Sequence, residues 1–222
     1  MFSLLEPGWI ATHFEDVRLS RSIQYFHFPL PPAAATFAYL RGLLTPDEAA
    51  RADRYIRAPD RERSAAGRGA LRHLLGPDVT LTTSPLGRPL AQAAGYPAFN
   101  VSHSGNTVLI GFNWEGRIGV DVEHFRPSDD DFLLTTMTDR ERALDARLDP
   151  AERRRFRYLL WTRKEAAAKA VGLGLHQDPA TLDVLDDTTP ASLSLSSFLL
   201  SGAPASIADD GGHEREFIRV VW

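Results

Sequence analysis

Apolar and polar residues alternate in three short segments near the middle of the chain, and this period of two predicts three β-strands. The segments span residues 99–104, 107–113 and 117–123. A Gly-Asn pair and a Glu-Gly pair separate them, and both pairs are common in hairpin turns. Short strands that follow one another along the chain most simply pair as an antiparallel meander. We therefore expect one sheet that contains all three strands.

Capping signals predict the helices. Thr45 with Glu48, and Thr138 with Glu141, have the spacing of a capping box, in which two side chains bond to orphan N–H groups of the first turn. The expected helices cover residues 46–57, 60–75, a short stretch from 139, and 150–172. The last of these is the longest; it follows Asp149 and ends at Gly172. Strand and extended loop are expected in the first forty residues, a solvated acidic loop at 129–131, and a terminal strand at 216–222.

Charge divides unevenly along the chain. Residues 1–117 carry 12 basic and 10 acidic side chains, and residues 118–222 carry 13 and 19, so the net charges are +2 and −6. This difference marks Arg117 as the boundary between two subdomains, residues 1–117 and 118–222. The whole chain has a net charge of −4, which gives no basic field of the kind that binds nucleic acid.

The composition excludes several kinds of site. The chain has no cysteine, so disulfides, thiolate metal sites, iron–sulfur clusters and a cysteine nucleophile are all excluded. No stretch reaches the ~18 apolar residues of a membrane span. The first residues lack the basic and apolar regions of a signal peptide. We expect a soluble, cytoplasmic protein that binds neither nucleic acid nor a membrane.

The third predicted strand carries two carboxylates on one face. Because side chains alternate along a strand, Asp121 and Glu123 lie on the same face as Gly119, opposite to Val120. Neighbouring carboxylates repel unless water or a cation lies between them, and oxygen-only ligands suit Mg²⁺ or Mn²⁺. A plain amphipathic edge strand with a wet acidic face is the other interpretation of this spacing.

The only two lysines among 25 basic residues, Lys164 and Lys169, lie in the longest predicted helix. Trp161, Glu165 and Lys169 recur every four residues and share one face, with Lys164 beside them. A further carboxylate and two ammonium groups are what a site for a metal and a phosphate would use. A surface Glu–Lys pair beside a core tryptophan is the plainer interpretation.

Three segments together resemble a known family. Phe-Asn-Val-Ser-His-Ser at 99–104, Ile-Gly-Val-Asp-Val-Glu at 118–123 and Trp-Thr-Arg-Lys-Glu-Ala-Ala-Ala-Lys at 161–169 are similar, in order and spacing, to the signature motifs of the surfactin-type 4′-phosphopantetheinyl transferases. Upstream, Gly87-Arg88-Pro89 resembles a contact of that family with coenzyme A. The likeness covers residues 45–175.

The resemblance implies an α+β fold of two similar subdomains related by a pseudo-twofold axis, with coenzyme A and Mg²⁺, or Mn²⁺, in the cleft between them. It implies metal ligands at Asp121, Glu123 and Glu165. Glu165 is also our candidate for the general base. Lys169 would contact the pyrophosphate, and Lys169 or Lys164 would stabilise or protonate the leaving group.

The remaining implied residues would hold coenzyme A. His103 with Ser102 would hold the adenosine 3′-phosphate end, and the other contacts would come from Arg51, Arg63, Arg88, Lys164 and Lys169. Glu48 departs from the family pattern, because some relatives have a basic residue there, beside the adenosine phosphates.

The reaction that the resemblance implies is transfer of the 4′-phosphopantetheine arm of coenzyme A to a serine of an apo acyl or peptidyl carrier protein, with release of adenosine 3′,5′-bisphosphate. The carrier could serve fatty-acid, polyketide or nonribosomal-peptide synthesis, and we expect the chain to be a monomer. Two alternatives use the same residues: a Mg²⁺-dependent hydrolase of nucleotides or coenzyme A, and a non-catalytic module that binds coenzyme A or a carrier.

The expected meander also makes a geometric prediction. Its first and third strands would run parallel with one strand between them. His103 and Asp121 should then lie at the same end of one sheet, roughly 10 Å apart.

Overall fold

The computed structural model describes residues 4–6, 8–76, 78–84, 89–92, 94–126, 129–172, 178–211 and 214–222. The protein has an α+β fold, and its chain forms two compact units. The α1–α3 unit contains residues 8–114 and 214–222, and the α4–α6 unit contains residues 1–7 and 115–213. No helix within the described ranges is long and apolar enough to cross a membrane.

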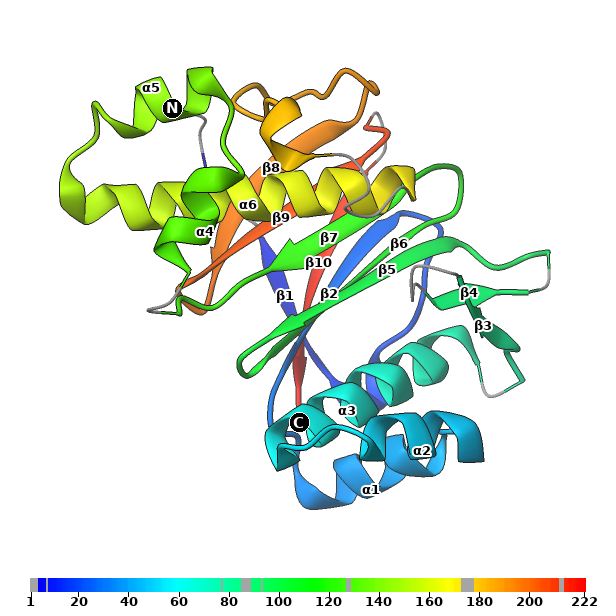
Figure 1. Cartoon of the computed structure of the whole chain (residues 1–222). Helices are drawn as coiled ribbons and strands as arrows, with labels where there is room; N and C mark the ends of the chain where they lie inside the picture. Colours follow the sequence, from blue (N-terminus) through cyan, green and yellow to red (C-terminus); the bar gives the residue numbers. More distant parts are fainter. Residues whose placement is uncertain are drawn as a thin grey trace. The chain divides into compact units, whose positions relative to one another are not determined.

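The α1–α3 unit combines a five-stranded sheet with three helices (Figure 1). The sheet has the order β1-β10-β2-β6-β5, in which β10 runs parallel to both of its neighbours and the other pairs are antiparallel. Its strands are β1 (Trp9–His13), β2 (Ile23–Pro29), β5 (Ala98–Ser104), β6 (Thr107–Asn113) and β10 (Arg215–Val221). The other elements are η1 (Phe14–Asp16), α1 (Ala34–Gly42), α2 (Pro46–Asp53), α3 (Ala58–Leu75) and the hairpin of β3 (Leu81–Thr83) and β4 (Pro89–Ala91).

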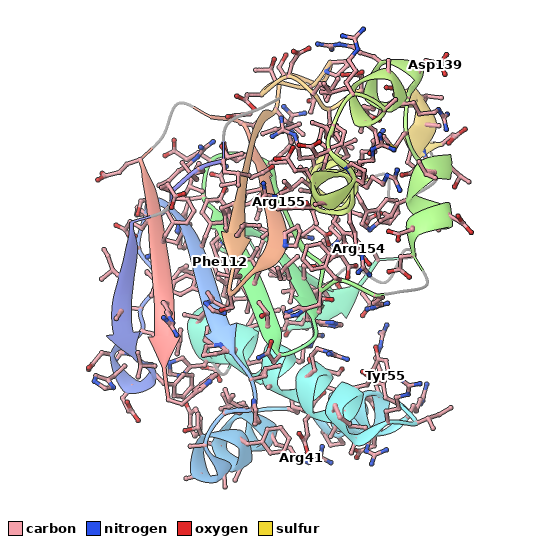
Figure 2. All side chains as sticks on the ribbon, turned by 90° about the vertical axis from the view of Figure 1, so that its left-hand side faces the viewer. Arg41, Tyr55, Phe112, Asp139, Arg154 and Arg155 are labelled. Carbon is pink, nitrogen blue, oxygen red and sulfur yellow. The ribbon has the colours of Figure 1, made fainter. Side chains whose placement is uncertain are left out.

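An aromatic core holds this unit together. Phe26 and Phe28 of β2 and Phe112 of β6 are buried in one cluster with Leu71 of α3. Phe112 lies among the packed side chains, whereas Arg41 of α1 lies on the outside (Figure 2). Burial of a side chain of this size stabilises a fold by roughly 1.5–3 kcal/mol, so this core fixes the position of α3 on the sheet.

The α4–α6 unit packs a long helix on a small sheet. Strands β7 (Ile118–Val122), β9 (Ala203–Asp209) and β8 (Ser194–Leu200) form an antiparallel sheet in that order. Helix α6 (Pro150–Val171) runs along this sheet and contacts all three strands (Figure 1). The remaining elements are α4 (Asp130–Thr135), α5 (Asp139–Asp145) and η3 (Pro179–Thr181).

Several predictions of local structure are confirmed. Both capping boxes are present, at the starts of α2 and α5. The longest helix is α6, and it ends at Gly172, whose φ of 75° is the left-handed conformation that favours glycine. The helix expected over residues 46–57 is shorter, because Asp53 ends α2 and a new helix, α3, begins at Ala58.

The predicted three-stranded meander is wrong. Strands β5 and β6 pair as expected, but β7 pairs with β9 in a different sheet. All five residues of β7 are buried in the α4–α6 unit, where helix α6 packs against this strand. His103 and Asp121 therefore do not share a sheet, and the separation predicted from the meander has no basis.

Other expectations also differ from the structure. The acidic residues at 129–131 form the start of α4 rather than a solvated loop, because carboxylates are favourable at a helix N-terminus. The first forty residues contain α1 as well as strands. The expected division placed the residues of β10 with 118–222. In the structure, β10 lies between β1 and β2 in the α1–α3 unit. It belongs there because its side chains Phe217, Ile218 and Val220 are buried.

Candidate active site

Gly119 allows helix α6 to pass very close to strand β7. A Cβ at residue 119 would lie 1.9 Å from the carbonyl oxygen of Ala166 and 2.6 Å from the backbone nitrogen of Ala170, so a side chain here would push the helix away. Asp121 follows two residues later on the same face of the strand. The close packing therefore brings Asp121 against the side of α6 that carries Glu165 and Lys169.

The ammonium group of Lys169 lies between two carboxylates. Its Nζ donates a hydrogen bond of 2.6 Å to Oδ1 of Asp121 and lies 3.9 Å from Oε2 of Glu165. Nζ also lies 3.4 Å from the carbonyl oxygen of Val120. The carboxylates outweigh the effect of burial, which alone would lower the pKa of this ammonium, and raise that pKa above its ordinary value. Lys169 is therefore charged at neutral pH.

The pKa of the Glu165 carboxyl is strongly raised. Burial raises the pKa of its carboxyl to about 6; Lys169 opposes this effect, and the negative charges of Asp121 and Glu123 add to it. Its Oε1 is buried and accepts no hydrogen bond from the described residues. A buried oxygen without a donor is costly, and a cation or an approaching hydroxyl group would relieve that cost.

The fit of a metal ion to this cluster is partial. Asp121, Glu123 and Glu165 supply only oxygen ligands, which suit Mg²⁺. Among the described residues, however, no group of three acidic or histidine side chains is arranged to hold a metal ion. Glu123 lies just after β7, with its Oε2 3.8 Å from Nη2 of Arg126. The oxygen-only chemistry of these side chains suits Mg²⁺, and one or two of the carboxylates would hold it.

The structure corrects the expectation for Lys164. Its side chain is buried, its Nζ lies 2.7 Å from Oε2 of Glu141, and it donates to the carbonyl oxygens of Pro179 (2.8 Å) and Leu182 (2.7 Å). These contacts use all three N–H groups of the ammonium, so Lys164 has no donor left for coenzyme A. The 100° rotation between neighbouring helix positions turns Lys164 into the packing of α5 and η3, away from Asp121.

A cavity of about 640 Å³ lies in the α1–α3 unit. This volume is in the range of small-molecule sites. Its wall includes the α2 residues Glu48 and Arg51, the α3 residue Arg68, and Val101 and His103 of β5. Tyr55, in the connection between α2 and α3, also lines it. Basic, aromatic and apolar side chains thus converge on one hollow.

The cavity brings together only some of the predicted contacts to coenzyme A. Arg51 and the exposed His103 line it, and Nη1 of Arg51 lies 3.4 Å from Oγ1 of Thr83. Ser102 is buried and does not line it, because side chains alternate along β5. Arg63 instead pairs with Asp60 and donates to the carbonyl oxygen of Gly105. Arg88 lies outside the described residues.

Sequence reasoning missed Arg68 and Arg72, which also line the cavity. Both bond to Glu48, the residue that departs from the family pattern. The available signal was their spacing of four residues in a predicted helix, which places both guanidinium groups on one face. Their partner lies in a separate helix, so the sequence pattern alone could not identify it.

Comparison with known proteins agrees with the motifs. The model of the 4′-phosphopantetheinyl transferase superfamily matches residues 117–209, which include two of the three motif segments. The chain is 31% identical over 202 residues to the 4′-phosphopantetheinyl transferase HetI of Nostoc sp., covering 86% of this chain and 85% of HetI. It is 34% identical over 142 residues to AcpT of Escherichia coli, covering 62% of this chain and 70% of AcpT.

A similarity to Sfp of Bacillus subtilis is weaker, at 25% identity over 139 residues, covering 60% of this chain and 62% of Sfp. The match to HetI extends over most of both chains and so is not limited to the motif segments. The chain is therefore an enzyme of the 4′-phosphopantetheinyl transferase superfamily.

Proposed function

We propose that this protein transfers the 4′-phosphopantetheine arm of coenzyme A to a serine of an apo carrier protein, in the manner of the surfactin-type enzymes. The observation that carries this proposal is the cluster of Asp121, Lys169 and Glu165 on β7 and α6. Phosphoryl transfer depends mainly on positioning and on stabilising charge at the phosphate oxygens, and this cluster combines a charged donor with two carboxylates.

In the proposed reaction, the serine oxygen forms a bond to the phosphorus that carries the pantetheine arm. The bond from that phosphorus to the bridging oxygen breaks, and adenosine 3′,5′-bisphosphate leaves with that oxygen. Glu165 accepts the serine proton, directly or through water. With a pKa of about 6, its carboxyl is mostly ionised at neutral pH and can act as a base.

Lys169 would hold the pyrophosphate and neutralise the charge that develops on the leaving phosphate. A lysine ammonium suits this role because it is a compact point charge with three donors. One of these donors is already used by Asp121, which fixes the position of Nζ. Asp121 therefore orients Lys169 as well as offering an oxygen ligand.

Mg²⁺ would be held by Asp121 and Glu165, with Glu123 nearby, and would supply further charge stabilisation at the phosphate oxygens. The buried Oε1 of Glu165, which accepts no hydrogen bond from the described residues, supports this assignment.

The nucleotide end of coenzyme A is proposed to bind in the cavity of the α1–α3 unit. Arg51 and His103 supply donors for phosphate, and Tyr55 supplies a ring that can pack against a base. The proposed contacts therefore come from the cavity wall, and Lys164 and the side chain of Ser102 are not among them.

Product analysis separates this function from hydrolysis. Coenzyme A and Mg²⁺ would be incubated with the protein alone, with an apo carrier protein, and with a carrier whose acceptor serine is alanine, and chromatography would follow adenosine 3′,5′-bisphosphate. We expect this product only with the intact carrier. Equal release in all three mixtures would identify a hydrolase, and no release from any of them would indicate a non-catalytic module.

A further inference from the structure

The carboxylate of Glu48 pairs with two arginines of the cavity wall, Arg72 and Arg68. It lies against Arg72 with two contacts, 2.6 Å from Oε2 to Nε and 3.2 Å from Oε1 to Nη2. Arg72 is buried and also donates to the carbonyl oxygen of Val79. The Nε and Nη2 edge of Arg72 therefore faces both carboxylate oxygens of Glu48 and neutralises their negative charge inside the fold.

Arg68 shares the same carboxylate but uses only one of its nitrogens. Its Nε donates a hydrogen bond of 2.7 Å to Oε1 of Glu48. Its Nη1 and Nη2 donate to no atom of the residues that the structure describes, and the side chain lines the cavity. Two guanidinium groups against one carboxylate leave a net positive charge, which lies on Arg68.

A second cation increases the electrostatic cost of this arrangement. Burial lowers the pKa of the Arg68 guanidinium, and although Glu48 opposes that effect, the positive charges of Arg72 and Arg51 lower it further. Arg51 lines the same cavity. Like charges that line one hollow repel, and a bound anion would relieve that repulsion. Glu48 supplies only part of this relief, because Arg72 shares its carboxylate.

We propose that Arg68 is a further substrate-binding residue of this enzyme, whose Nη1 and Nη2 bind a phosphate of the nucleotide, and that Glu48 is a positioning residue that holds the guanidinium plane. A guanidinium anchored through Nε presents its two other nitrogens as a fork that matches two phosphate oxygens.

The identity of the phosphate follows from the proposed function, on which this inference rests. The pyrophosphate of coenzyme A is assigned to Lys169 and its carboxylates. The 3′-phosphate monoester is the phosphate that remains for the cavity, where three arginines, Arg51, Arg68 and Arg72, outnumber the two carboxylates of Asp47 and Glu48. Its charge of about −1.5 to −2 suits this net positive lining.

Isothermal titration with coenzyme A and with dephospho-coenzyme A, which lacks the 3′-phosphate, tests this inference. The variants are Arg68→Gln, Arg68→Lys and the control Arg54→Gln, which removes the same charge from an exposed position outside the cavity. For Arg68→Gln we expect coenzyme A to bind ten- to a hundredfold more weakly, with dephospho-coenzyme A changed less than twofold. Arg68→Lys should recover part of the lost affinity, and Arg54→Gln should bind both ligands as the wild type does.

Two results would overturn the role of Arg68 while leaving the proposed function intact: Arg68→Gln binding coenzyme A as tightly as the wild type, or losing affinity equally for both ligands. The second result would show that the cavity had lost its shape. If Arg68→Gln does not fold, the same comparison is made with Arg68→Lys. An equal loss of affinity for coenzyme A and dephospho-coenzyme A in that variant would also count against the role of Arg68. A wild-type protein that does not bind coenzyme A would instead contradict the proposed function, and this inference would fall with it.

Discussion

Nζ of Lys169 lies 2.6 Å from Oδ1 of Asp121, so the one lysine that faces the acidic strand is already paired with it. Asp121, Glu123 and Glu165 set three carboxylates against the ammonium of Lys169 and the guanidinium of Arg126, so the cluster has a formal net charge of −1. A charge of this size suits a divalent cation but would repel a bare pyrophosphate. In the proposed reaction, Lys169 and a bound Mg²⁺ would together offset that repulsion.

Asp121→Asn should abolish transfer to a carrier protein. The substitution removes an oxygen ligand and the charged partner of Lys169 but keeps the shape of the side chain. We expect transfer to fall at least a hundredfold at saturating Mg²⁺, with the melting temperature changed by only a few degrees. Asp139→Asn, at the exposed start of α5 (Figure 2), is the matched control. Full activity of Asp121→Asn at physiological Mg²⁺ would show that the acidic cluster is not the reaction site.

Lys169→Arg should lose most of the activity although it preserves the charge. The guanidinium is a planar fork, and it cannot place one compact charge between Asp121 and a phosphate as an ammonium does. We expect kcat to decrease at least tenfold. Unchanged turnover would mean that any cation serves at this position, and the case for a lysine-specific site would be lost.

Lys164→Met should lower stability. The substitution leaves Glu141 buried opposite an apolar side chain, and breaking a buried ion pair in this way costs about 3 kcal/mol or more. Urea denaturation would measure the loss, and Arg54→Met, which removes a positive charge at an exposed position, provides the comparison. A Lys164→Met protein as stable as the wild type would contradict the structural role assigned to Lys164.

The pKa of Glu165 should depend on Asp121. Burial and the neighbouring carboxylates hold it at about 6, so in the metal-free protein a carbon-13 carboxyl titration should find it there. Asp121→Asn removes a negative neighbour, so this pKa should fall. Because a proton and Mg²⁺ compete for one carboxylate, Mg²⁺ should bind more weakly below pH 6 than above it. The same pKa in both proteins would show that the two carboxylates do not interact.

The sequence predicted local structure well because caps and turns are local interactions. Thr45 and Glu48 are three residues apart, and their capping box needs no other part of the chain. The alternation in β7 also placed Asp121 on the face that meets α6. By contrast, the partner of β7 is β9, more than eighty residues later in the chain. Nothing in the local pattern specifies that pairing.

The two lysines illustrate the same limit at the candidate site. Their position in one helix was the signal, yet only Lys169 faces Asp121, while Lys164 pairs with Glu141 of α5. Helix periodicity places two residues on different faces, but it does not tell which face meets a cavity and which meets another helix. The pairing of Glu48 with Arg68 and Arg72 was hidden for the same reason, because it joins two helices.

Intact-protein mass spectrometry of an apo carrier protein is the most direct test of the proposed function. The carrier would be incubated with coenzyme A, Mg²⁺ and this protein, with carriers from fatty-acid, polyketide and nonribosomal-peptide synthesis tried in parallel. We predict that at least one carrier gains the mass of one phosphopantetheine group, and that the gain disappears when its acceptor serine is changed to alanine. If every carrier keeps its original mass while coenzyme A remains intact, the protein does not catalyse the transfer proposed here.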